Sequence, residues 1–316
     1  MKRAFMIFYV FAMVFIIAAC EKPVPDGPTS LPLPTAPPSS NVNEPETVQN
    51  NEMNIKEKDE ELAPESAGLA SLSGYFAYTN VEGNQLLMLE FYDNAQGVEN
   101  IDFAVGNNGQ TMSISYSHFQ ERNEDDNGRQ SASNFPNQGG HVFTCVEGAL
   151  EPDTTYFICR AVDIEACLLP FTSQVISEWF EYPPADSAII QQVEEIKSRS
   201  VIESNIFAVA EDGAAVGMFL FERMGNDMLF SLAYIHDNEI LFVDFPAEYN
   251  EYSVWRADAG DHPGIFQMLF IAKDGEELMF GLSWFAPEGE SASIYRVEGE
   301  TLVDVGIEGY RYMAPN

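Results

Sequence analysis

The sequence predicts a mainly β protein: an N-terminal β-sandwich followed by a C-terminal antiparallel β-meander or barrel, with one linking helix. Two observations favour this class. Short apolar segments alternate with turn residues over most of the chain beyond residue 67. Only residues 186–199 carry apolar side chains at helical spacing. With 316 residues, the chain is long enough for two domains with cores of their own.

Residues 1–19 have the composition of a secretion signal. Lys2 and Arg3 give a positive start, and residues 4–19 form an almost wholly apolar run that ends at Cys20. That run has the length of a signal peptide and is short for a membrane-spanning helix. We therefore expect residues 1–19 to be removed and the remainder to be exported.

Residues 17–20, Ile-Ala-Ala-Cys, resemble the lipobox of bacterial lipoproteins. The resemblance implies cleavage before Cys20, a diacylglyceryl thioether on its thiol, and often a further acyl chain such as palmitate on the new amine. Two or more acyl chains anchor a protein stably in a bilayer, whereas one chain binds only marginally. The expected location is therefore the cell membrane or outer membrane, with the folded part on the non-cytoplasmic side.

The segment from Cys20 to residue 67 has the composition of a tether. It has few large apolar residues to offset the chain entropy lost on folding, so we expect disorder with extended stretches. Its prolines include Pro23, Pro25, Pro28, Pro32, Pro34, Pro37, Pro38 and Pro45. This tether would hold the folded part away from the membrane.

Residues 68–182 read as short strands separated by turns, which fits a β-sandwich. The expected strands are 74–79, 85–92, 100–105, 111–118, 141–147, 155–162 and 174–180.

Within this part, residues 144–156 resemble the corner between strands E and F of fibronectin type III domains. The matching residues are Leu150, Pro152, Thr154 and Tyr156. The resemblance implies that the tyrosine hydroxyl bonds back to the chain just upstream. Arg160 departs from the pattern, because an apolar residue is expected there. The fold resemblance alone implies adhesion or spacing only by analogy.

Residues 183–316 predict a helix followed by an antiparallel meander or barrel. In the helix, Ile189, Ile190, Val193 and Ile196 share one face, which we expect to pack on the following strands. The expected strands are 205–210, 215–223, 228–235, 239–245, 253–257, 265–273, 277–285, 292–297 and 301–312, joined by tight turns such as Asp212-Gly213 and Asp274-Gly275.

Many aromatic residues lie on these strands, and they predict either a filled core or the lining of a ligand cavity. They are Phe219, Phe221, Phe230, Tyr234, Phe242, Phe266, Phe270, Phe280, Trp284 and Phe285.

Three cysteines remain after Cys20, and an exported chain can oxidise them. Cys145 and Cys159 flank the proposed corner, whereas Cys159 and Cys167 would close the next hairpin. We expect one disulfide among the three, with one thiol left over, and the sequence leaves both pairings open.

Oxygen-rich segments give two weak candidates for a metal site. Residues 123–128 partly match a calcium loop, with Asp125 and Asn127 among the candidate ligands, but Asn134 stands where a bidentate glutamate is required. Asp258, Asp261 and His262 cluster two carboxylates and an imidazole. The alternative for both segments is a solvated polar turn. No cofactor is expected, and no familiar zinc, triad or phosphate-loop motif occurs in the sequence.

The charge of the chain bears on its partners. The formal net charge is −35, and loss of Lys2 and Arg3 with the leader makes it −37. Such a surface repels phosphate backbones, so nucleic-acid binding is not expected. The expected partner is the membrane, through the lipid on Cys20, together with an envelope protein or a small molecule.

Three functions fit these observations. The first is a membrane-anchored, non-catalytic binding or interaction lipoprotein of the cell envelope. The second is a surface hydrolase that uses acidic residues on glycan or peptide. The third is a structural or assembly subunit of an envelope complex.

Overall fold

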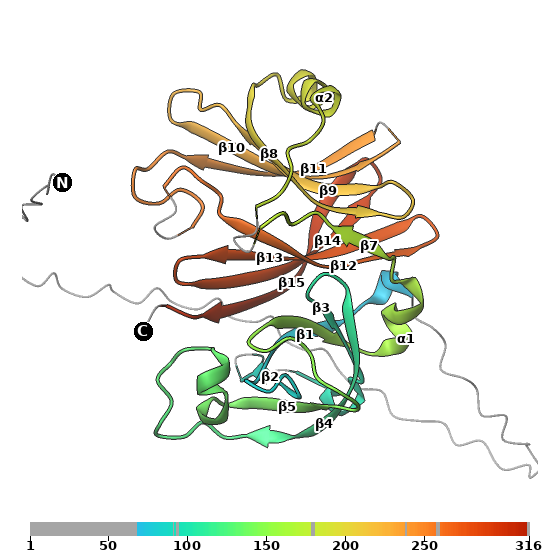
Figure 1. Ribbon diagram of the computed structural model, residues 1–316, viewed down its shortest axis with the longest axis vertical. Helices are drawn as coiled ribbons and strands as arrows, with labels where there is room; N and C mark the ends of the chain where they lie inside the picture. The colour runs from blue at the N-terminus through green and yellow to red at the C-terminus, as the bar shows by residue number, and fades with distance from the viewer. Residues whose placement is uncertain are drawn as a thin grey trace, which may run out of the picture. The chain divides into compact units, whose positions relative to one another are not determined.

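The computed structural model describes residues 68–314, except 91, 93, 94, 178–180, 238 and 257–259 (Figure 1). All of these residues belong to one compact unit. The leader, Cys20 and the tether lie outside the described residues. The predicted mainly β class is confirmed, because strands dominate the described part. None of the described helices is long and apolar enough to cross a membrane.

The first six strands form a closed barrel in the order β1-β2-β5-β4-β3-β6, and β6 closes it by pairing with both β1 and β3. Their bounds are β1 Gly74–Thr79, β2 Gln85–Leu89, β3 Phe103–Gly106, β4 Gln110–Gln120, β5 Gly140–Cys145 and β6 Thr155–Cys159. Three short 3-10 segments, Leu69–Ser71, Val98–Asn100 and Ala132–Asn137, precede or connect them.

Part of the barrel wall is buried on both faces. Ala77, Ile158 and Tyr156 belong to a cluster inside the barrel, whereas Phe76 and Phe157 belong to a cluster that includes residues of a neighbouring sheet. Side chains alternate between the faces of a strand. Strands β1 and β6 therefore have continuous runs of buried residues, and only β4 alternates with exposed positions over most of its length.

The remaining strands form two antiparallel meanders (Figure 1). The five-stranded sheet has the order β11-β10-β9-β8-β7 and the four-stranded sheet the order β12-β13-β14-β15. Their bounds are β7 Phe171–Ser173, β8 Val201–Ala210, β9 Ala215–Phe221, β10 Asp227–His236, β11 Glu239–Glu248, β12 Ile265–Asp274, β13 Glu277–Ala286, β14 Gly289–Glu298 and β15 Thr301–Tyr312.

The two meanders pack face to face as a sandwich. Phe207, Met218 and Phe230 of the five-stranded sheet share a core cluster with Phe266 and Phe280 of the four-stranded sheet. The opposite face of the four-stranded sheet packs on the barrel, and the buried residues on that face include Leu269, Phe270, Met279, Ala292 and Ile294. The four-stranded sheet is therefore a middle layer that is buried on both faces.

The predicted helix is α2, Ser187–Lys197, and it lies on the outer face of the five-stranded sheet (Figure 1). Val193 is fully buried there, and Ile189 and Ile190 pack beside it. Ile196, the fourth residue of the predicted stripe, is exposed. A second helix, α1 (Ala161–Ile164), and a 3-10 turn at Glu165–Cys167 lead from the barrel to β7.

The C-terminal part is an antiparallel meander, one of the two forms predicted for it, and its two sheets pack as a sandwich. The N-terminal strands, expected as a sandwich, instead form a closed barrel. The barrel closes because β6 pairs with both β1 and β3, and these strands are distant from β6 in the sequence. Side chains alternate along a strand in the same way in a barrel and in a sandwich, so the sequence pattern does not distinguish the two. Residues 174–177, where a strand was expected to begin, are not in a strand, and β7 just before them pairs with β8 of the five-stranded sheet.

Candidate binding site

A pocket of about 550 Å³ lies where the barrel meets the four-stranded sheet. This volume is within the range of about 300–1,000 Å³ that is typical of small-molecule sites. Its walls come from the β3–β4 hairpin tip, the corner before β6, the segment after β7, and strands β12 to β15. The lining residues are Asn107, Asn108, Glu151, Asp153, Thr154, Thr155, Val175, Ser177, Gln267, Phe285, Glu290, Arg311 and Met313.

Arg311 and Glu290 form the buried, charged floor of this pocket. They are register partners on β15 and β14, and their side chains are only 5% and 3% exposed. Arg311 Nη1 lies 3.2 Å from Glu290 Oε2. Glu290 also accepts hydrogen bonds from the hydroxyls of Thr155 (2.7 Å) and Ser283 (2.5 Å). A buried charge is costly unless it is paired and hydrogen-bonded, and these contacts therefore stabilise the two charges in their buried position.

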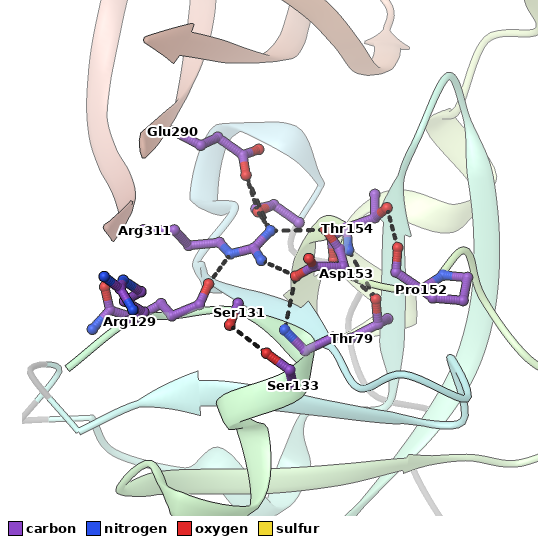
Figure 2. Close-up of polar contacts among 12 residues, drawn as sticks. Thr79, Arg129, Ser131, Ser133, Pro152, Asp153, Thr154, Glu290 and Arg311 are labelled. Carbon is purple, nitrogen blue, oxygen red and sulfur yellow. Dashed lines mark hydrogen bonds and ion pairs between the residues drawn. The ribbon is translucent and has the colours of Figure 1, made fainter. Parts of the chain in front are cut away.

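Arg311 also joins the sheet to the barrel (Figure 2). Its guanidinium donates to the carboxylate and the backbone carbonyl of Asp153, and Nε donates to the Gln130 carbonyl at 3.0 Å. The guanidinium also lies 4.6 Å from the ring centroid of Tyr78. Burial raises the pKa of Tyr78, so its ring is a neutral surface beneath the cation.

The corner before β6 forms a second wall, and it contains the motif that resembles a fibronectin type III corner. The Tyr156 hydroxyl accepts a hydrogen bond from the Glu151 backbone N–H at 3.1 Å, as that resemblance implies. The same hydroxyl donates to Gln110 Oε1 at 2.5 Å, and burial raises the pKa of Tyr156 to about 12. Thr79 fixes the corner from β1 by donating to the Glu151 carbonyl. It also accepts from the Thr154 N–H (Figure 2).

The hairpin tip between β3 and β4 forms the third wall. Asn107, Asn108 and Gly109 all have positive φ, at 42°, 60° and 87°, a conformation that asparagine and glycine tolerate best. The N–H groups of Asn108 and Gly109 donate to the carbonyls of Met268 and Leu269, where β12 carries a register shift. Irregular pairing at this point leaves carbonyls of β12 available to the tip.

Side-chain amides line the pocket beside this tip. Gln267 Nε2 donates to Asn107 Oδ1 at 3.0 Å, and Asn107 Nδ2 donates to Gln110 Oε1 at 3.3 Å. Asn108 Oδ1 is buried and accepts no hydrogen bond from any of the described residues. A buried acceptor without a donor costs about 1–3 kcal/mol, and the tip of the hairpin bears this cost.

Two further pockets are less suited to specific polar recognition. The larger, of about 700 Å³, lies beside Tyr75 and Ile307, and no polar side chain that lines it is buried. The smaller, of about 410 Å³, contains the half-exposed pair Glu203 and His262.

The candidate calcium ligands lie in a loop that is organised by its own hydrogen bonds. Asn127 Oδ1 accepts from the Arg129 N–H, whereas Asp125 is exposed and its own backbone N–H donates to Asn123 Oδ1. The buried carboxylate of the loop is instead Asp126. Burial opposes its charged form, but hydrogen bonds from Asn134, Gly128 and Gln138 outweigh burial and hold the pKa of Asp126 below its usual value. Asn134, at the twelfth position of the loop, thus acts as a donor.

The second candidate metal cluster is only partly described, because Asp258 lies outside the described residues. His262 Nε2 lies 3.3 Å from the Glu203 carboxylate, and His262 Nδ1 accepts from the Gly264 N–H. The hydrogen bond to Glu203 raises the pKa of His262, although burial acts in the opposite direction. In the described part of the chain, no group of three or more His, Cys, Asp or Glu side chains is arranged to hold a metal ion.

The expected disulfide is not formed, and Cys145, Cys159 and Cys167 are free thiols. Cys145 belongs to the cluster inside the barrel, whereas Cys159 belongs to the cluster outside its wall. The barrel wall thus separates these two thiols. Cys159 and Cys167 contact the same outer cluster without being bonded. Burial raises the pKa of all three thiols, which lowers their reactivity.

Comparison with known proteins found no matching family model, no similar curated protein and no similar solved structure.

Proposed function

We propose that this chain is a lipid-anchored protein of the bacterial cell envelope, whose folded part binds a ligand without transforming it. The ligand would bind in the pocket of about 550 Å³ between the barrel and the four-stranded sheet, which we call the junction pocket. The proposal has two parts, an anchor and a binding site. The leader, the Ile-Ala-Ala-Cys sequence at 17–20 and the proline-rich segment that follows support the anchor. Two or more acyl chains on Cys20 would hold the protein at a membrane.

The junction pocket carries the binding part of the proposal. Its floor is a buried Arg311–Glu290 pair, and its walls are fixed by hydrogen bonds from three separate segments. Side chains held in this way lose little conformational entropy when a ligand binds, which favours affinity. Asp153 and Glu290 both bind Arg311, and this arrangement suits a rigid recognition surface.

The anchor is tested by mass spectrometry of the full chain expressed in a bacterial host and extracted with detergent. We expect an N-terminal peptide that begins at Cys20 and carries the mass of a diacylglyceryl group. Cys20→Ala should remove that mass and move the protein from the membrane fraction to the soluble fraction. Cys167→Ala is the matched control and should remain in the membrane fraction. Retention of residues 1–19 without lipid would contradict the anchor.

A further inference from the structure

We propose that the junction pocket binds a neutral, polyhydroxylated ligand, namely an oligosaccharide. This inference rests on the proposed binding function and adds the class of ligand to it. It follows from three properties of the wall: its hydrogen-bonding groups, its charge and its apolar surface.

The hydrogen-bonding groups match a ligand that is rich in hydroxyls. Asn107, Asn108 and Gln267 carry amides at the pocket, and Thr154 adds a hydroxyl. Gln267 Nε2 and Asn107 Nδ2 each use one N–H within the wall, and each amide nitrogen carries a second N–H. A sugar hydroxyl likewise donates one hydrogen bond and accepts others. A hydroxyl pairs with such amides as donor or acceptor without introducing a charge.

The charge of the wall disfavours an anionic ligand. Arg311 is the one cationic side chain among the lining residues, and Asp153 and Glu290 both bind it. The exposed carboxylate of Glu151 adds a further negative charge at the rim. A phosphate or carboxylate would therefore meet net repulsion, in a chain that is already strongly acidic.

Apolar surface lies beside the amides. Half-buried Phe285 and Val175, which is 40% exposed, both line the pocket. Ligand sites combine apolar and aromatic walls with a few well-placed polar groups, and the C–H face of a sugar ring fits such a wall. A hydrophilic ligand without an apolar face, such as a free inorganic ion, would leave this surface unused.

The backbone conformation of Asn108 allows a substitution that removes the side chain with little strain. Because Asn108 has a φ of 60°, Asn108→Gly removes the amide while suiting the left-handed backbone. Gln191→Ala, on the exposed face of α2, is a matched control that removes an amide outside the pocket.

The test is isothermal titration calorimetry on the full mature lipoprotein in a detergent without a sugar headgroup. The neutral probes are maltohexaose, cellohexaose, xylohexaose, mannohexaose and chitohexaose. Hexagalacturonate and spermidine are the anionic and cationic probes. We expect at least one neutral hexamer to bind, Asn108→Gly to weaken it about threefold to tenfold, as the loss of one hydrogen bond predicts, and Gln191→Ala to leave it unchanged.

The outcomes separate the ligand class from the proposed function. If no neutral hexamer binds, if only a charged probe binds, or if folded Asn108→Gly binds as tightly as wild type, the saccharide inference is overturned while the anchored binding function still stands. Absence of lipid on Cys20 overturns the anchor and leaves the ligand class intact. Shortening of a bound hexamer supports the ligand class and overturns a purely non-catalytic function.

Discussion

Two arginine–glutamate pairs lie on the four-stranded sheet, and burial is the main difference between them. In the pair Arg311–Glu290, the side chains are 5% and 3% exposed. In the pair Arg296–Glu298, they are 31% and 48% exposed. When an exposed pair forms, each charge exchanges contacts with water for contacts with its partner, so the pair adds little to the free energy of unfolding. In a buried pair no water stabilises either charge, so removing one member leaves the other charge unpaired at a large cost.

The comparison shows where charge determines structure in this acidic protein. An exposed carboxylate is solvated by water without a specific partner. At the junction, however, the guanidinium of Arg311 is shared by the sheet and the barrel, through Glu290 on one side and Asp153 on the other. Loss of this single cation would leave Glu290 buried without its charge partner.

The largest effect is therefore expected for Arg311→Ala, which should lower the free energy of unfolding by about 3–5 kcal/mol. Arg296→Ala is the matched variant on the same sheet and should cost no more than about 1 kcal/mol. Urea unfolding followed by circular dichroism measures both. Equal losses in the two variants would show that burial is not what distinguishes the pairs.

Glu290→Gln should have the next largest effect, about 1–3 kcal/mol. Glu290 accepts hydrogen bonds from Ser283, Thr155 and Arg311, and a glutamine would present an NH₂ group to some of these donors. Glu298→Gln on the exposed pair is the control and should change stability by less than about 1 kcal/mol. A neutral result for Glu290→Gln would mean that Asp153 alone satisfies Arg311.

The sequence predicted the secondary structure of the molecule better than its closure. Alternating apolar residues and turns such as Asp212-Gly213 and Asp274-Gly275 indicated most of the strands, because these signals are local. The helix stripe was also local, and three of its four residues pack as expected. The pairing of β6 with β1 and β3 joins distant segments, and no local pattern specifies it.

The candidate site was missed for a related reason. Its residues come from seven separate segments, and apart from the corner before β6 none of these segments belongs to a recognisable motif. The local pattern at Arg311 points the wrong way: Arg311 alternates with Tyr310 and Tyr312, which predicts the tyrosines on the buried face of the strand. In the structure Arg311 is buried and both tyrosines are exposed, because the partners of Arg311 come from distant segments. The corner at 150–156 was recognised, although its place in a pocket wall was not.

Tyr156→Phe tests the recognised corner and should cost about 1 kcal/mol or slightly more. The change removes the hydroxyl that bridges the Glu151 N–H and Gln110 Oε1, and it leaves both groups without that partner. Tyr252→Phe, at a side chain that is 74% exposed, is the control and should be neutral. Thermal unfolding of both variants gives the comparison, and equal melting temperatures would show that the corner hydrogen bond is energetically unimportant.

The smallest effect on stability is expected for the half-exposed pair of Glu203 and His262. Here the strength of the pair depends on pH, because His262 titrates near neutral pH. The hydrogen bond between them raises the pKa of His262 and lowers the pKa of Glu203. The contribution of His262 to stability is therefore full below its ordinary pKa of 6.5 and is lost as the pH rises through its folded value. That of Glu203 is full above 4.5 and is lost as the pH falls through its folded value.

The pair should thus stabilise the fold most between pH 4.5 and 6.5, by a small amount because both side chains are more than a third exposed. Titration of His262 by NMR should give a pKa that falls toward 6.5 in Glu203→Gln, which keeps the shape of the side chain and removes its charge. Glu195→Gln, on helix α2, is the control and should leave the titration unchanged. If the pKa of His262 is the same in wild type and in Glu203→Gln, then solvent screens the interaction completely. The hydrogen bond between these two half-exposed side chains would then have no measurable effect on the pKa of His262.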